Sequence, residues 1–194
     1  MAPVAYAWRE VGGTAASMSA AGSFPLHGKL FYNQADLRTH WSHQQGHGKP
    51  ASVRGSIACM RRELARNLAE GSALQWYDFS NGWTFGDSRL TAEAQRLFEA
   101  GRVRNATPDW PAEDYLLVVV DEEQTGAMSV FRPPYGGELI FRQREYLARS
   151  GVPHRTFLWS DLQRRPELLR HRAIMLLNLF HLDDDEAAFL RDRV

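Results

Sequence analysis

The sequence has little cysteine and no long apolar run. Its 194 residues include one cysteine, Cys59, which excludes an internal disulfide and leaves no cysteine cluster for a structural metal. The longest apolar runs, near Leu116–Val120 and Ala173–Leu177, fall far short of the roughly 20 residues that cross a bilayer. We therefore expect no membrane partner. The N-terminus lacks a basic segment followed by an apolar stretch, so we expect either a cytoplasmic protein or a start that is not the natural one.

The sequence also lacks net charge. Its 23 Lys and Arg residues balance 23 Asp and Glu residues, and 44% of the chain is hydrophobic, which is ordinary for a globular protein. Balanced charge provides no basic surface for a polyanion, so nucleic acid is not expected as a partner. Only Lys29 and Lys49 are lysines. The preference for arginine over lysine could indicate a binding role, but overall composition explains it more simply.

The first half alternates predicted strands and helices after a loop-like stretch of 28 residues rich in Gly, Ala and Ser. Spacings of three and four predict an amphipathic helix whose apolar positions are Val53, Ile57, Met60, Leu64 and Leu68. Gly71 stands where the C-cap of that helix belongs. The other elements predicted here are a strand at Lys29–Tyr32, a strand at Ala73–Phe79 and a helix at Leu90–Phe98.

Residues 105–113 are the predicted linker, because Pro108 and Pro111 oppose both helix and central strand. They separate a domain at 1–104 from a second domain at 114–194. The second domain reads as β-α-β-α-β-α, which favours a small parallel sheet. Its predicted elements are the strands Leu116–Val120, Thr156–Trp159 and Ala173–Phe180, the helices Glu138–Arg149, Pro166–Arg170 and Ala187–Arg193, and a capping box at Asp183 and Glu186.

One motif lies at the end of the first predicted strand. Gly28-Lys29 stand at the start of this strand, and Gln34-Ala35-Asp36-Leu37-Arg38-Thr39 follow it. The stretch Leu26–His40 resembles a segment of β-galactosidase-like glycoside hydrolases related to family 42, in which Glu-x-Asp-x-Arg-Thr ends the seventh strand of a TIM barrel. Further matches occur in the same order: Arg61-Arg62-Glu63, Gln75-Trp76-Tyr77-Asp78, Gly82-Trp83, Val119-Val120-Asp121-Glu122, Gly151-Val152-Pro153, Trp159-Ser160-Asp161-Leu162 and Leu177-Asn178-Leu179-Phe180.

The resemblance implies an α/β fold: terminal β/α units of a TIM-type barrel, followed by a small flavodoxin-like domain that accompanies trimer formation in family 42 enzymes. The barrel's active site would lie at the C-terminal ends of its strands. The residues implied to bind carbohydrate are Asn33, Gln34, Asp36, Arg38, Trp76, Asp78 and Trp83, with Tyr32 and Tyr77 as further aromatic surfaces. The alternative is that the aromatic residues belong to the core and that Asp36 and Arg38 form a local ion pair. No cofactor is implied.

Hydrolysis by this chain is not expected. Retaining glycosidases use two carboxyl groups about 5 Å apart, and Gln34 occupies the position of the motif's glutamate. A neutral amide cannot act as the nucleophilic carboxylate. Asp36 would share the face of Gln34 if the strand stayed extended, but would lie one pleat further along. The fourth-strand acid/base of the related barrels has no counterpart here.

A second interpretation belongs to a different class, a non-catalytic structural or oligomerisation module. A partial barrel exposes unpaired strand edges, and such edges recruit other chains. The expected partners are a second copy of this chain or a polypeptide that carries the missing barrel units. In that case the isolated chain would oligomerise.

Two ligand hypotheses have weaker motifs. His40, His43 and His47, with His27 upstream, could surround zinc if they lay on a helix, but Gly46, Gly48 and Pro50 favour a polar loop, so no metal is expected. Thr125–Ser129 follow a strand where a flavodoxin holds its phosphate. Prolines and glycines at 133–137 intervene before the next helix, so flavin is not expected either.

Overall fold

The structure is a computed structural model that describes residues 2–3, 8–43, 45–46, 48–78, 84–107, 115–128, 136–170 and 173–193. It is a mixed α/β protein with two short parallel sheets. Its contacts divide the chain into two compact units: 1–18 with 30–112, and 19–29 with 113–194. The passage at 112 to 113 lies inside the predicted linker. The sequence had assigned 19–29 to the first domain, whereas the structure groups this segment with the second unit.

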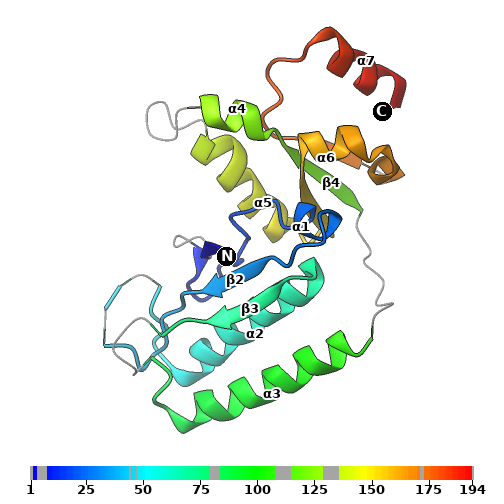
Figure 1. The fold of residues 1–194 in the computed structure, drawn as a ribbon. Helices are drawn as coiled ribbons and strands as arrows, with labels where there is room; N and C mark the ends of the chain where they lie inside the picture. Colours follow the sequence, from blue (N-terminus) through cyan, green and yellow to red (C-terminus); the bar gives the residue numbers. More distant parts are fainter. Residues whose placement is uncertain are drawn as a thin grey trace. The chain divides into compact units, whose positions relative to one another are not determined.

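The first unit is built on three parallel strands in sequential order. These are β1 (Ala2–Pro3), β2 (Tyr32–Ala35) and β3 (Ala73–Trp76). Helix α2 (Val53–Glu70) connects β2 to β3, and helix α3 (Ser88–Asn105) follows β3. Figure 1 shows the strands pointing the same way, with α2 and α3 side by side along one face of the sheet.

Helix α2 matches the predicted amphipathic helix, and both of its ends are capped. The Ser52 hydroxyl accepts a hydrogen bond from Gly55 N, and Gly71 closes the helix at φ 68°, a left-handed conformation that glycine adopts without strain. Its apolar stripe packs against the sheet and α3. The core contains Ala35, Leu37, Cys59, Met60, Leu90 and Leu97, so Cys59 is a buried structural thiol.

Strand β2 lies three residues later than predicted. Lys29 and Leu30 are exposed and outside the strand, whereas Asn33 and Ala35 are buried. Phe31 is buried but lies outside the strand, and the first strand residue, Tyr32, is exposed. The start of β2 therefore follows the pairing of Tyr32 with Ala73 of β3 rather than burial. Helix α3 extends beyond the predicted end at Phe98 to Asn105, and Gly101 within it does not adopt a positive φ.

The second unit is built on a parallel sheet of three strands. Its strands β4 (Leu116–Val120), β5 (His154–Leu158) and β6 (Ala173–Leu176) lie in the order β5-β4-β6. The connecting helices are α4 (Glu122–Ala127), the π-helical η2 (Gly137–Arg142), α5 (Gln143–Ser150), α6 (Trp159–Arg164) and the 3-10 helix η3 (Pro166–Arg170), and α7 (Asp184–Arg193) ends the unit. The predicted parallel arrangement is confirmed.

Alternate residues of β4 enter two separate cores. Leu117 and Val119 pack with Trp159 and Leu162 on one face. Val118 packs with residues of η2 and α5 on the other face. Figure 1 shows α5 and α6 on opposite sides of β4. A strand covered on both faces needs apolar residues at every position, which explains the continuous run that predicted it.

The end of the chain departs from the prediction in two places. Strand β6 stops at Leu176, and that residue is 39% exposed, so Ala173–Phe180 is not one buried strand. Trp159 opens α6 instead of ending β5. The predicted capping box is confirmed: Asp183 Oδ1 accepts from Glu186 N at 2.8 Å, and Glu186 Oε2 accepts from Asp183 N at 3.1 Å.

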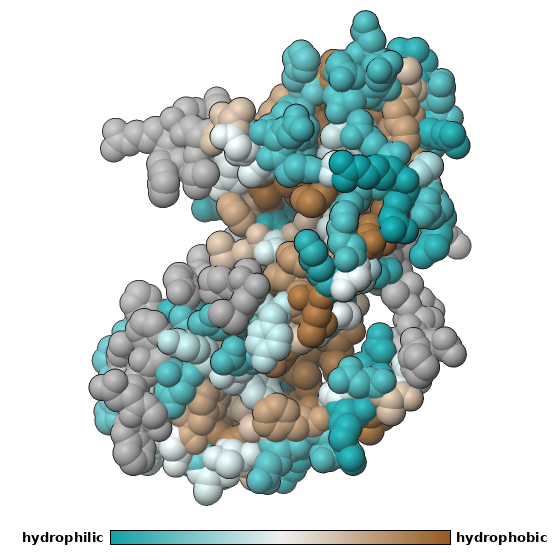
Figure 2. Space-filling view, viewed as in Figure 1, coloured by the Kyte–Doolittle hydropathy of each residue, from teal (hydrophilic) through white to brown (hydrophobic). Residues whose placement is uncertain are grey.

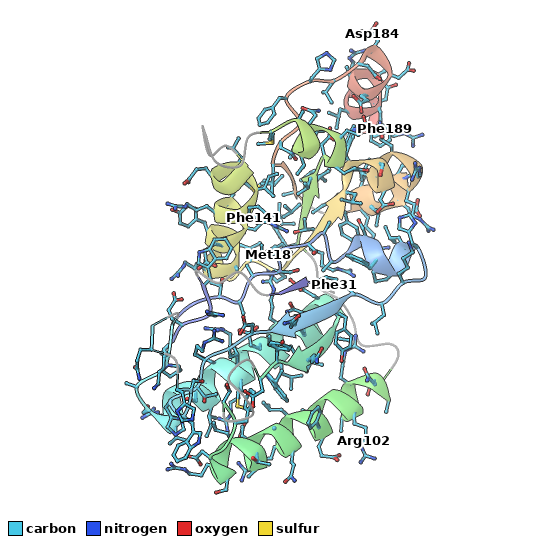
Figure 3. All side chains as sticks on the ribbon, turned by 60° about the vertical axis from the view of Figure 1, so that its left-hand side comes forward. Met18, Phe31, Arg102, Phe141, Asp184 and Phe189 are labelled. Carbon is cyan, nitrogen blue, oxygen red and sulfur yellow. The ribbon has the colours of Figure 1, made fainter. Side chains whose placement is uncertain are left out.

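Helix α7 is joined to α6 by two side-chain contacts. The Trp159 indole N–H donates to Glu186 Oε1 at 2.6 Å, and the Trp159 and Phe189 rings meet edge to face at 5.7 Å. Figure 3 shows Phe189 on the side of α7 toward α6 and Asp184 at its outer end. These contacts secure a helix in which no residue is fully buried.

The segment 19–29 carries helix α1 (Ser23–Leu26) and lies along β5. Gly22 N donates to Thr156 O at 2.9 Å, and the Ser23 hydroxyl accepts from Leu158 N at 2.8 Å. The segment therefore satisfies backbone groups on the outer edge of β5. Its composition shows no periodicity, which is why the sequence predicted only a loop.

Candidate functional site

The C-terminal ends of β2 and β3 form the candidate site. Parallel neighbours end at the same edge of a sheet, and β2 and β3 pair in register from Tyr32 with Ala73 to Ala35 with Trp76. The residues after β2 and β3 therefore meet at this edge, toward which both arrows point in Figure 1. We call it the β2/β3 edge.

Asp36 forms a buried ion cluster at this edge. Its Oδ1 lies 2.6 Å from Arg38 Nη1, and its Oδ2 lies 3.2 Å from Arg9 Nη1. Arg9 Nη1 also donates to the Asp36 carbonyl at 2.7 Å. The three residues are between 2% and 5% exposed, so they brace the end of β2. This is the predicted local ion pair with Arg9 added, and Arg9 comes from a segment that gave no signal in sequence.

Asp78 is brought to the same edge through Thr84. Asp78 Oδ1 accepts from Thr84 N at 3.2 Å, and the Thr39 hydroxyl donates to the Thr84 carbonyl. The loops after β2 and β3 are thereby connected to each other. Asp78 is half-buried, so it combines a structural hydrogen bond with access to solvent.

The other predicted residues lie elsewhere. Asn33 is 1% exposed and shares its face of β2 with Ala35, toward the helices. Gln34 is half-buried on the opposite face, beside Gln75. Asp36 N donates to Gln34 O at 3.1 Å, so the chain turns here and Asp36 does not continue the extended strand of Gln34. Trp83 lies outside the described residues.

Trp76 belongs to the core of the first unit. Its ring meets Phe98 of α3 edge to face at 5.4 Å and packs against the apolar cluster. Trp76 and Tyr32 line a pocket of about 520 Å³ between the sheet and the ends of α2 and α3. Figure 2 shows hydrophobic residues gathered in this part of the first unit. Neither residue joins Asp36 and Asp78.

Two aromatic side chains at the β2/β3 edge are exposed, Trp41 at 49% and Tyr77 at 37%. The Trp41 indole lies against the backbone of Gly86, where a Cβ atom would come within 2.5 Å of Trp41 Nε1. Because Gly86 has no side chain, the Trp41 ring can pack directly against the backbone of the loop after β3. Trp41 was not among the residues predicted from sequence, although it directly follows the resembling segment Leu26–His40.

His40 holds the loop after β2 onto α2 and α3. Its Nδ1 lies 3.0 Å from the Ser56 hydroxyl and its Nε2 lies 3.1 Å from Asp87 Oδ2. Arg89 beside Asp87 holds the pKa of that carboxyl well below its usual range. Ser56 is 1% exposed and accepts from His40 N at 2.8 Å. This serine, histidine and aspartate therefore form a structural network rather than an accessible nucleophile.

The histidine-rich loop does not converge on a metal in the part of the chain that the structure describes. No group of three or more His, Cys, Asp or Glu residues there is placed to hold a metal ion. His40 is engaged with Ser56 and Asp87 instead, and His47 lies outside the described residues. In the second unit, residues 125–127 belong to α4, whose N-cap is Asp121.

Comparisons of the chain with protein-family models, with curated proteins and with solved structures find no match. The fold and the site define a mixed α/β protein with two short parallel sheets. Among the helices that the structure describes, none has both the length and the apolar character to cross a bilayer.

Proposed function

We propose that this chain is a glycoside-hydrolase-like protein that binds carbohydrate at the β2/β3 edge. The observation that carries the proposal is the sequential parallel order β1-β2-β3, with a helix after β2 and another after β3. Successive units of a TIM barrel have this arrangement, and barrel enzymes bind their substrates at the C-terminal ends of the strands. Asp36 and Arg38 pair after β2, and hydrogen bonds through Thr39 and Thr84 connect their loop to Asp78 after β3.

The burial of each group suggests its role. Asp36 and Arg38 are too buried to contact a sugar and would hold the end of β2 in place. Trp41 and Tyr77 would offer flat apolar rings to the C–H face of a sugar. Asp78 is half-buried and follows β3, and its carboxyl oxygens would accept a hydrogen bond from a sugar hydroxyl.

The second unit supports a flavodoxin-like assignment. The flavodoxin strand order 2-1-3-4-5 begins with the second, first and third strands. The order β5-β4-β6 is the same when β4 counts as the first strand, and helices cover both faces. The proposal thus places a flavodoxin-like domain after the barrel-like units, in the order that the resemblance implies.

Carbohydrate binding is testable with galactosides on the full chain. We expect saturable binding of lactose or methyl β-galactoside by calorimetry, weakened roughly two- to tenfold by Trp41→Ala or Tyr77→Ala, since aromatic contacts contribute about 0.5–1.5 kcal/mol. Tyr146→Ala is the matched control, because Tyr146 is also exposed, at 59%, but lies on α5. Absence of saturable binding, or equal losses in the control, would contradict the proposal.

The proposal includes the absence of hydrolysis. Gln34 cannot serve as a carboxylate nucleophile, and Asp36 is held between two guanidinium groups. We expect no turnover of nitrophenyl β-galactoside above the uncatalysed rate. Turnover that Asp36→Ala or Asp78→Ala abolishes would show that the chain is an active glycosidase after all.

A second candidate function is a non-catalytic module that completes another chain's fold. The observation in its favour is that β3 lies at the edge of the described sheet and pairs with β2 on one side. Light scattering at high protein concentration tests this candidate. A monodisperse monomer would contradict it, whereas a stable oligomer without galactoside binding would favour it over carbohydrate recognition.

A further inference from the structure

A second pocket lies in the second unit, beside helix α1. It has a volume of about 410 Å³ and is lined by residues of the segment 19–29 together with Leu158 at the end of β5. We call it the α1 pocket. Its volume falls within the range of small-molecule sites. No galactoside-binding residue proposed above belongs to it.

The charged group that lines the α1 pocket is a cation. Lys29 is exposed at its wall, and no acidic side chain is among the lining residues that the structure describes. A second cation lies behind the wall: Arg144 is 4% exposed and donates from Nη1 to the Ser19 carbonyl at 3.1 Å. Against the Asp161 carboxylate behind His27, the two cations Lys29 and Arg144 leave the surroundings net positive, which favours an anion.

Two hydrogen-bonding side chains complete the pocket. The Ser23 hydroxyl accepts from Leu158 N at 2.8 Å, which leaves its own hydrogen to donate. His27 Nε2 lies 2.7 Å from Asp161 Oδ1, and Asp161 is 2% exposed. An ionised carboxylate only accepts, so Nε2 carries a hydrogen toward Asp161 and Nδ1 is not used by that bond. Asp161 thereby fixes the ring that faces the pocket.

Apolar groups form the rest of the wall. Phe24, Ala20 and Leu158 line the same pocket as Lys29. We propose that the α1 pocket binds a small organic anion, a carboxylate or phosphate monoester that carries one apolar ring. The anionic group lies against Lys29 and the Ser23 hydroxyl, and the ring packs on Phe24 and Leu158. This proposal is independent of carbohydrate binding in the first unit.

The lysine content of the chain provides a direct test. Lys29 and Lys49 are its two lysines, so isotope-labelled reductive methylation places NMR-visible methyl groups at these positions and at the N-terminal amine. Full-length labelled protein is titrated with benzoate, phenyl phosphate and benzamide. We expect the Lys29 signal to shift saturably with at least one anion, while the Lys49 signal and the benzamide titration show no saturable shift.

The two anions distinguish the preferred headgroup, since saturation by benzoate alone indicates a carboxylate site and saturation by phenyl phosphate alone a phosphate site. Either result supports the proposal. Saturation by benzamide with equal affinity would overturn it, because benzamide has the shape of benzoate without its charge. Failure of both anions to saturate at millimolar concentration would overturn it as well.

Calorimetry on unmethylated variants measures the contribution of the charge. Lys29→Gln should weaken anion binding about two- to fivefold, because an ion pair with an exposed lysine contributes about 0.5–1 kcal/mol and 1.4 kcal/mol is tenfold. Lys49→Gln is the matched control and should bind as the parent does. Lys29 is exposed, so its replacement leaves folding intact. Unchanged affinity in Lys29→Gln would exclude the α1 pocket as the site.

Discussion

The side-chain amide of Asn178 bonds both backbone groups of Asp121. Its Oδ1 accepts from Asp121 N, and its Nδ2 donates to the Asp121 carbonyl, each at 2.8 Å. Asn178 is fully buried and follows β6, while Asp121 follows β4 and caps α4. The Asn178 side chain thus supplies the hydrogen bonds that a strand backbone would make to Asp121, beyond the end of β6 at Leu176.

Replacing Asn178 by Ala should destabilise the second unit by about 2–4 kcal/mol, because two buried backbone groups lose their partner. Urea unfolding followed by circular dichroism measures the change. Asn105→Ala is the control, since Asn105 lies exposed at the end of α3. A loss below about 0.5 kcal/mol would mean that the amide bridge adds no net stability.

Glu63 should make the unfolding free energy of the first unit depend on pH between 4.5 and 7. Burial raises the pKa of Glu63 from 4.5 to about 7, although Arg62 Nη2 donates to its Oε1 at 2.9 Å. Above pH 7 the carboxyl is ionised in both the folded and the unfolded chain, and the folded state carries the full burial penalty. As pH falls from 7 to 4.5 the folded state takes up the proton first, so this penalty disappears and stability rises.

Glu63→Gln should therefore raise the unfolding free energy above pH 7, by up to about 3 kcal/mol, and flatten its pH dependence between pH 4.5 and 7. Chemical denaturation at several pH values measures both effects. Glu99→Gln is the control, because Glu99 and its partner Arg102 are both exposed on α3. The same pH profile in Glu63→Gln as in the parent would rule out Glu63 as the titrating group.

His40 should carry its hydrogen on Nε2. Arg89 holds the pKa of Asp87 low, so Asp87 is an ionised carboxylate that can only accept from His40 Nε2, 3.1 Å away. Nitrogen NMR of the imidazole distinguishes the two tautomers near neutral pH. His43, which is exposed, serves as the internal comparison. A ring protonated on Nδ1 alone would contradict this arrangement.

Asp36→Asn should destabilise the first unit strongly, by about 3–5 kcal/mol, because it removes the carboxylate between the buried guanidinium groups of Arg9 and Arg38. Asp78→Asn should cost less than about 1.5 kcal/mol, since Asp78 is half-buried. Thermal unfolding compares the two variants. Equal losses would mean that Asp36 does not act as the brace of β2.

The sequence predicts elements whose signal is local. Helix α2 was predicted because its apolar stripe and Gly71 lie within one continuous segment. Strand β4 was predicted because a strand covered on both faces must be apolar throughout. Helix α4 was missed, because its six residues carry no apolar period and form under the Asp121 cap.

The candidate site was predicted in part for the same reason. Asp36 and Arg38 are two residues apart, so their ion pair can be inferred from sequence. Arg9 reaches Asp36 from 27 residues away, and only the folded chain brings them together. Trp76 is an aromatic residue of the kind that binds sugars, but successive side chains of a strand point to opposite faces, and that of Trp76 packs against Phe98 of α3. The residue type can therefore be used to predict the chemistry of a side chain, whereas its location depends on which face of the strand it occupies.

Because segment 19–29 belongs to the second unit, this unit is not one continuous stretch of chain. The chain enters the second unit at Ser19, leaves it after Lys29 and returns at Glu113. A fragment that begins at Glu113 would therefore lack the residues that bond Thr156 and Leu158 along β5. A synthetic peptide of residues 19–29 added to that fragment would supply the missing edge from a separate molecule, so the second unit is a natural candidate for reconstitution from two pieces.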